Sequence, residues 1–349
     1  MEQNHIAGSG GRRDRGIDSM KGLLCHIMML AHTVFSFGYE ETGNTVWKLI
    51  SHAFHLVGFP GFLFCFGFVC QRAYLEEADS AAVKGRLLRR FFITFAAYLF
   101  NAVAMDALLH GRFSLETLRD TLHLNSIHGA VYVLAFALQF LMLLLCGGAI
   151  RRIAAKGWLG AVAVAASLGF AALPVIGINL PVVSLFIKTA GQSGYPLLPY
   201  YGFFVLGAYF SKNRRLFDWR VTAFALLGGL AFAAYCLTAR TLPMRFPPSI
   251  FWVLGGYPLV LALYLCCGLI KRPFFHTLLA PFGRRTLYYL TATNLILAVW
   301  EYLSPRLGLA IPLQWYIPCY LALVLVCFGL FWLYARLRRV GKGAVATHI

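Results

Sequence analysis

Lys21 and His32 lie on one strongly apolar segment, with ten residues between them. In an α-helix, which rises 1.5 Å per residue, this spacing separates the two residues by about 16 Å along the axis. His32 would then lie past the middle of a bilayer whose apolar core is about 30 Å thick. An ionisable group at that depth costs free energy, so its presence indicates a function. The pair predicts chemistry inside a membrane, with one reactant on each side.

The composition is that of an integral membrane protein. Of the 349 residues, 60% are hydrophobic and 13% are charged, and the mean hydropathy is +0.70. Soluble domains carry about 25% charged residues. The net charge of +18 falls in short clusters between apolar segments, which argues against a nucleic-acid partner. The nine cysteines lie in or at the edges of apolar segments, which favours packing over a disulfide framework.

The apolar segments predict an all-α, polytopic membrane protein with about ten transmembrane helices. Of the 31 Lys and Arg residues, 24 fall on one side of this topology. The positive-inside rule therefore places both termini in the cytosol. We expect a basic N-terminal tail at residues 1–21, a membrane domain at 22–335 and a basic C-terminal tail at 336–349. The predicted spans are 22–38, 49–71, 91–109, 127–149, 157–176, 198–211, 219–238, 249–270, 286–304 and 312–334.

Histidines and carboxylates gather in the predicted outer half of the membrane domain. His32 would act there as a base or as an acyl carrier, and Asp106 or Glu301 would orient it. His52 and His55 are i,i+3 neighbours, which is weak evidence for a metal site, and we expect no metal. A structural alternative is that these side chains simply meet water or lipid headgroups. Aromatic residues near the outer connections could stack on sugar rings or form the interfacial belt (Tyr195, Tyr200, Tyr201, Trp315 and Tyr316).

Arginine clusters mark the predicted inner face. Arg86, Arg89 and Arg90 open one span, and Arg284 and Arg285 precede another. Ordinary positive-inside anchoring explains such clusters, and so does a clamp for a phosphorylated cytosolic substrate. The planar guanidinium binds phosphate oxygens with two parallel hydrogen bonds, which suits it to the second role.

Several sequence blocks occur in the order found in one family. Ile17 and Asp18 precede Lys21, and ten residues later comes His32. The blocks that follow are the phenylalanine-rich segment at 59–68, Arg86-Leu87-Leu88-Arg89, Ser126-Ile127-His128-Gly129 and the segment at 195–207. This order resembles the transmembrane acyltransferase superfamily, which includes the acyltransferase-3 proteins and the heparan-α-glucosaminide N-acetyltransferase family.

Two departures from the family pattern stand out. Acyltransferase-3 proteins often carry a histidine in a late Gly-x-x-Ser-x-x-x-Tyr-x-x-His block. Here that block begins at Gly283 and continues to Thr293 and Asn294, with no histidine. The Ser-Gly pair of the phenylalanine-rich block is replaced by Phe66 and Gly67. No role of the late histidine is therefore carried over to this chain.

The resemblance implies transfer of an acyl group, expected to be acetyl, from cytosolic acyl-CoA to a hydroxyl or amine. The acceptor would be a glycan or glycolipid outside, and the membrane a bacterial inner membrane. The arginines named above, with Lys21, would hold the CoA phosphates, and Asp18 and His128 would be motif residues. The alternatives are a transporter or flippase of lipid-linked sugars and a non-enzymatic scaffold. The oligomeric state stays open.

Overall fold

The computed structural model describes residues 14–37, 45–76, 80–110, 131–177, 181–189, 196–270 and 272–346. Within these ranges the chain is helical apart from its connections and one isolated parallel bridge between Ile176 and Thr189. This agrees with the predicted all-α fold, because a helix satisfies every internal backbone group without water.

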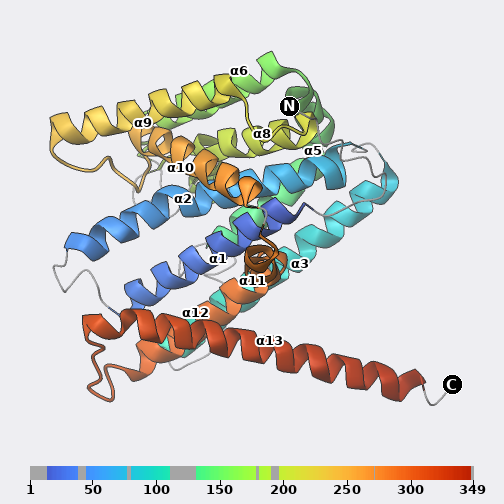
Figure 1. Ribbon diagram of the computed structural model, residues 1–349, viewed down its shortest axis with the longest axis vertical. Helices are drawn as coiled ribbons and strands as arrows, with labels where there is room; N and C mark the ends of the chain where they lie inside the picture. The colour runs from blue at the N-terminus through green and yellow to red at the C-terminus, as the bar shows by residue number, and fades with distance from the viewer. Residues whose placement is uncertain are drawn as a thin grey trace.

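Each of the ten predicted spans coincides with a helix (Figure 1). Two short helices were not predicted from the sequence: α7, between the fifth and sixth predicted spans, and α11, between the eighth and ninth. The topology of ten spans and its orientation stay predictions. The helices are α1 (Arg15–Ser36), α2 (Thr45–Cys70, extended by a π-helical turn at Gln71–Leu75), α3 (Ala81–His110), α5 (Val131–Ala155), α6 (Gly157–Ala172), α7 (Pro181–Ser184), α8 (Leu197–Asn213), α9 (Trp219–Ala239), α10 (Ile250–Leu269), α11 (Pro273–Arg284), α12 (Thr286–Leu303) and α13 (Tyr316–Ala346).

Six helical segments in the described part are long and apolar enough to cross a membrane. They lie at 49–75, 81–109, 133–153, 219–239, 250–269 and 313–336. The other helices that match predicted spans are shorter or more polar, and α6 and α8 have 16 and 17 residues. The helices α1 and α12 are not among the six, and they carry the ionisable residues Asp18, Lys21, His32 and Glu301.

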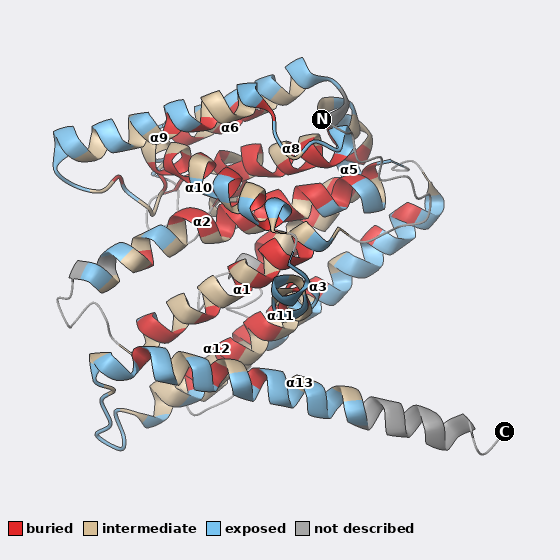
Figure 2. Cartoon of the chain, viewed as in Figure 1, coloured by how far each residue is buried: buried red, intermediate tan, exposed pale blue. Residues whose placement is uncertain are grey.

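The core lies where α2, α8, α10 and α1 pack together, and the outer helices α3, α9 and α13 expose much of their surface (Figure 2). Glycines allow two of the closest approaches. A Cβ on Gly67 of α2 would overlap the carbonyl of Phe204 on α8, and one on Gly207 would overlap that of Phe64. Small residues at such positions let helices pack by van der Waals contact, which is the main attraction available in lipid.

The short helix α11 lies across the N-terminal half of α1 and is seen end-on in Figure 1. Gly22 of α1 and Gly283 of α11 bring the two backbones together, because a Cβ on either would overlap a carbonyl of the other helix. On its other face α11 exposes Phe274 and Leu278. The contact fixes the position of Arg284 and of the start of α12 relative to α1.

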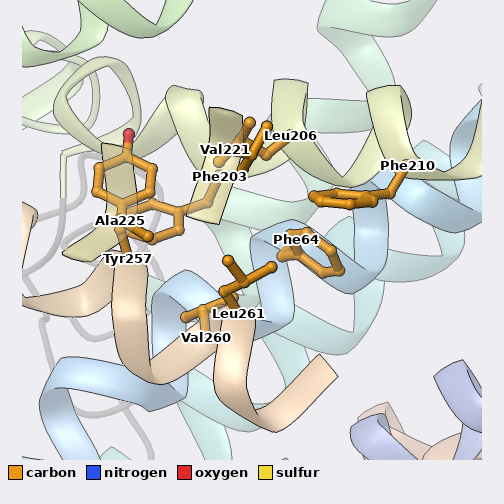
Figure 3. A pocket seen from close by; sticks show the side chains of 9 residues that line it. All are labelled: Phe64, Phe203, Leu206, Phe210, Val221, Ala225, Tyr257, Val260 and Leu261. Carbon is orange, nitrogen blue, oxygen red and sulfur yellow. The ribbon is translucent and has the colours of Figure 1, made fainter. Parts of the chain in front are cut away.

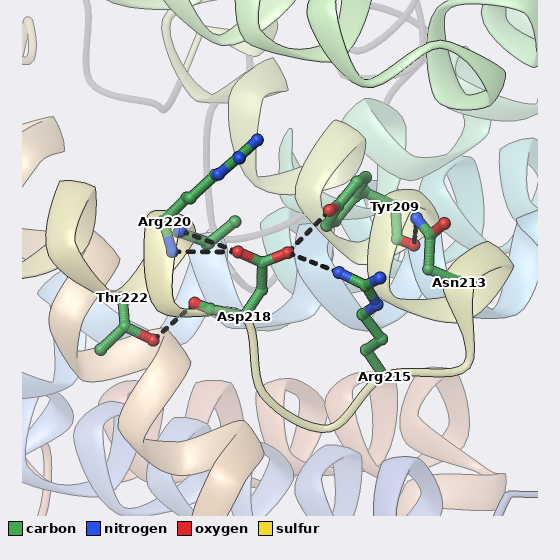
Figure 4. Close-up of polar contacts among 7 residues, drawn as sticks. Tyr209, Asn213, Arg215, Asp218, Arg220 and Thr222 are labelled. Carbon is green, nitrogen blue, oxygen red and sulfur yellow. Dashed lines mark hydrogen bonds and ion pairs between the residues drawn. The ribbon is translucent and has the colours of Figure 1, made fainter.

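A polar cap joins α8 to α9 (Figure 4). Asp218 is the N-cap of α9, and one of its oxygens accepts the N–H groups of Arg220 and Val221 at 3.0 and 3.4 Å. The other oxygen accepts Tyr209 Oη at 2.8 Å and Arg215 Nη1 at 3.3 Å. Burial raises the pKa of this carboxyl, but these hydrogen bonds outweigh burial and hold the pKa below its ordinary value.

Candidate active site

His32 lies in the last quarter of α1 and is half-buried. Its Nδ1 lies 2.8 Å from Oδ1 of Asn294 on α12. An amide oxygen can only accept a hydrogen bond, so Nδ1 carries the ring proton. The unprotonated Nε2 is then available as a base or a nucleophile, which is the form that the sequence-based hypothesis requires.

Asn294 is the main candidate site residue that sequence reasoning missed. It is 3% exposed, and no acceptor within the described structure pairs with its Nδ2. Its place in the late block, where the family often has a histidine, and its amide in an apolar helix were the two available signals. The sequence could not show that α12 packs beside α1 in this register.

Glu301 lies farther along the same two helices. Its Oε1 accepts the hydroxyl of Ser36 at 2.5 Å. The contacts of His32 with Asn294 and of Ser36 with Glu301 show that α1 and α12 run in the same direction. From the sequence, Asp106 or Glu301 was expected to hold the second ring nitrogen of His32. In the structure that nitrogen, Nδ1, is hydrogen-bonded to Asn294.

Asp106 belongs to α3, which packs on α12. One turn before it, Ala102 packs in a cluster with Leu290 of α12 and Met28 of α1. In Figure 1, α1, α3 and α12 run in the same direction across the view. Asp106, His32 and Asn294 each lie four residues beyond a member of this cluster, toward the same end of the bundle. A role for Asp106 in the site stays a prediction.

At the N-terminal end of α1, Asp18 is a buried carboxylate that contacts two cations. Lys21 Nζ lies 2.9 Å from Oδ1, and Arg284 Nε lies 3.3 Å from Oδ2. Asp18 is 2% exposed, whereas the side chain of Arg284 is nearly half exposed. The carboxylate therefore positions both cations, and their combined charge exceeds its own by one.

The three arginines of α3 are all exposed on its first turns. Arg86 donates to the carbonyl of Ala73 at 3.4 Å, and Arg90 hydrogen-bonds the hydroxyl of Tyr74. Both contacts are made to the π-helical turn that extends α2. Arg285 is occupied differently, because its guanidinium stacks 4.0 Å from the ring centre of Phe331 on α13. The chain thus presents two basic groups, one on α3 and one at the junction of α11 and α12.

The remaining histidines differ in their surroundings. His26 hydrogen-bonds Tyr320 Oη at 2.8 Å and packs against Phe282, which is a packing role. His52 and His55 lie on α2, and His55 is within electrostatic reach of His32. Among the described residues no group of three or more His, Cys, Asp or Glu side chains is placed to hold a metal ion. His128 lies outside the described residues.

The aromatic residues expected to be exposed near the outer connections need a correction. Tyr200 and Tyr316 are fully buried in the core, because each packs against neighbouring aromatic rings. Tyr201 is half-buried, and Trp315 is 54% exposed. Tyr195 lies outside the described residues. Only part of the predicted sugar-stacking surface is therefore available.

A small apolar cavity lies apart from these residues (Figure 3). Its volume of about 10 Å³ has room for roughly one water molecule. No residue predicted to act in catalysis or donor binding lines it, so we treat it as a packing defect between helices. The lining residues are Phe64, Phe203, Leu206, Phe210, Val221, Ala225, Tyr257, Val260 and Leu261.

Comparison with known proteins supports the resemblance seen in the sequence. The family model of the acyltransferase domain of the acyltransferase-3 group matches residues 14–333. That range includes His32, Asn294, Asp18 and both basic groups. No curated protein and no solved structure matches the chain. Because the matched range covers most of its 349 residues, the chain belongs to the acyltransferase-3 family of membrane acyltransferases.

Proposed function

We propose that this protein moves an acyl group, acetyl in the simplest case, from acyl-CoA to a hydroxyl or amine on the opposite side of a membrane. The family supports acyl transfer in general. The observation that carries the proposal is the bond between His32 Nδ1 and Asn294 Oδ1. It leaves the Nε2 lone pair of a deep imidazole free to take a proton.

The proposed step is a direct transfer. Nε2 of His32 removes the proton from the acceptor hydroxyl or amine, whose oxygen or nitrogen bonds to the thioester carbonyl carbon. The tetrahedral intermediate then expels the CoA thiolate by breaking the C–S bond. The imidazolium returns its proton to that thiolate, so His32 ends neutral and CoA leaves as a thiol. Asn294 stabilises the imidazolium by keeping its oxygen on Nδ1–H.

Two features support a donor site at the N-terminal ends of α1 and α3. Arg86, Arg89 and Arg90 form an exposed group that suits phosphate oxygens. Lys21 lies on the helix that leads to His32, and Asp18 on that helix also holds Arg284 of α11. The spacing of about 16 Å between Lys21 and His32 asks for a donor with a long flexible arm, such as the pantetheine of CoA. In this proposal that end of the bundle faces the cytosol, and the acceptor enters from the other end.

The proposal is tested with purified protein in nanodiscs and acetyl-CoA labelled in the acetyl group. We expect CoA release, with a membrane-envelope extract as the source of acceptor, to fall by about 10²-fold or more in His32→Ala. His26→Ala is the matched control, because His26 is another half-buried histidine on α1 and has a packing role. Equal turnover by the wild type and His32→Ala would contradict the proposal.

A further inference from the structure

One arginine and several neutral hydrogen-bonding side chains form a group on α2 and on the turn before α10, within electrostatic reach of His32. His55 on α2 is within electrostatic reach of His32, of His52 and of Arg245. Arg245 lies in the turn that leads into α10. In the proposed topology this group lies at the end of the bundle from which the acceptor would enter.

Arg245 has an unusual environment for an arginine. Its guanidinium lies 4.6 Å from the ring centre of Phe246, and the residue is half-buried. Within the described ranges no carboxylate pairs with it. Five N–H donors on a planar cation are therefore placed beside the site without an anion. The ring centre of His55 lies 6.5 Å from that of Phe246.

Arg306 shows what an arginine with an ordinary surface role looks like. It also stacks on an aromatic ring, with the guanidinium 3.5 Å from the centre of Tyr302. It is exposed, however, and donates to the carbonyl of Tyr302 at 2.5 Å. Stacking alone therefore does not explain why Arg245 is half-buried next to histidines.

The fold builds the position of Arg245 rather than leaving it to a loose loop. The N–H of Ser249 donates to the carbonyl of Met244 at 2.9 Å, which closes the turn. The Ser249 hydroxyl then accepts the N–H of Trp252 at 3.2 Å and caps α10. Phe246 packs against the main core. A fixed backbone keeps the guanidinium on one face of the ring.

Trp252 gives a second, independent observation. It is 1% exposed, its ring centre lies 6.1 Å from that of His52, and its indole N–H has no acceptor in the described structure. A buried donor without an acceptor costs about 1–3 kcal/mol, and an oxygen atom of a ligand would remove this cost. Both Trp252 and Arg245 thus lack an acceptor in the same neighbourhood.

We propose that Arg245, Trp252, His52 and His55 bind an anionic oxygen group on the acceptor, so that the enzyme selects an acidic sugar over a neutral one. This rests on the proposed function, because it identifies the class of the acceptor. The planar guanidinium matches a carboxylate or phosphate with two hydrogen bonds. A neutral acceptor would leave the cation without a counter-charge in a poorly solvated place.

The test is a binding measurement without acetyl-CoA, on protein in nanodiscs of neutral lipid, with tryptophan fluorescence as the signal. The probes are methyl glucuronide, which carries a carboxylate, glucose 6-phosphate, which carries a phosphate, and neutral methyl glucoside. We expect at least one acidic probe to bind about tenfold more tightly than the neutral sugar. The stronger of the two acidic probes identifies the source of the charge.

Variants locate the binding. Arg245→Gln is expected to raise the Kd of the preferred acidic probe about tenfold, and Arg245→Lys to raise it less, because it keeps the charge and loses the planar fork. Arg306→Gln is the matched control and should leave Kd within about twofold. Equal binding of acidic and neutral sugars, no saturable binding of either acidic probe, or unchanged binding by Arg245→Gln would overturn this inference. Because no transfer is measured, its failure is distinct from failure of the acyltransferase proposal.

Discussion

Replacing Asn294 with leucine tests the geometry of the proposed base. The substitution keeps the number and branching of the side-chain heavy atoms but removes the oxygen that accepts Nδ1–H of His32 at 2.8 Å. The imidazole can then rotate or change its tautomer, and its N–H is left without an acceptor. A buried donor in that state costs about 1–3 kcal/mol. If this free energy appears in the barrier, kcat falls by about 5-fold to 150-fold.

The assay is release of CoA from labelled acetyl-CoA, measured as kcat and KM for the donor. We expect kcat to fall and KM to change little, because Asn294 contacts His32 and not the donor phosphates. Asn294→Asp keeps an acceptor oxygen and should retain more activity than the leucine variant. The matched control is Asn101→Leu, which changes another fully buried asparagine, on α3. A well-folded Asn294→Leu protein with kcat within about twofold of wild type would refute the reasoning.

Two further predictions concern the scaffold. Gly283→Ala should lower the midpoint of thermal unfolding in detergent and cost about 1–3 kcal/mol of stability, because its Cβ would overlap the carbonyl of Asp18. Gly169→Ala is the control and should be neutral or stabilising, because its Cβ meets open space. Equal midpoints for the two variants would contradict the close contact between α1 and α11. Asp218→Asn should destabilise the protein at neutral pH, because the lowered pKa of Asp218 shows that its ionised form stabilises the fold. That stability is present above the unfolded-state pKa of about 3.9 and is lost as the pH falls through the folded-state pKa. The difference in unfolding free energy between Asp218→Asn and wild type should therefore shrink in acid. A constant difference from neutral to acidic pH would contradict this role of Asp218.

Much of the helical arrangement was predictable from local sequence. A span needs about 20 apolar residues, and this signal can be counted along the chain without knowledge of any contact. The ten predicted segments therefore coincide with helices. The helix α11 was missed because it has 12 residues and exposes one apolar face, so its length is below that of a span.

The candidate site was only partly predictable, because its key contacts join residues far apart in sequence. The position of His32 late in an apolar helix was predictable from the sequence, and its depth in the membrane stays a prediction. Its bond to Asn294 and the pairing of Arg284 with Asp18 depend on how α11 and α12 pack against α1, and glycine positions such as Gly22 and Gly283 set that packing. The burial of Tyr200 and Tyr316 was missed for the same reason, since an aromatic residue near a helix end can face the core or the interface.

The central claim is that the acyl group of a CoA donor meets Nε2 of His32 inside the bundle. The most direct measurement is a structure, determined by cryo-electron microscopy in nanodiscs, with a thioether analogue of acetyl-CoA that cannot transfer its acyl group. We expect the phosphates near Arg86, Arg89 and Arg90, and the carbonyl carbon about 3–3.5 Å from Nε2 of His32. An analogue whose acyl end lies away from His32, or whose phosphates bind at the opposite end of the bundle, would contradict the account.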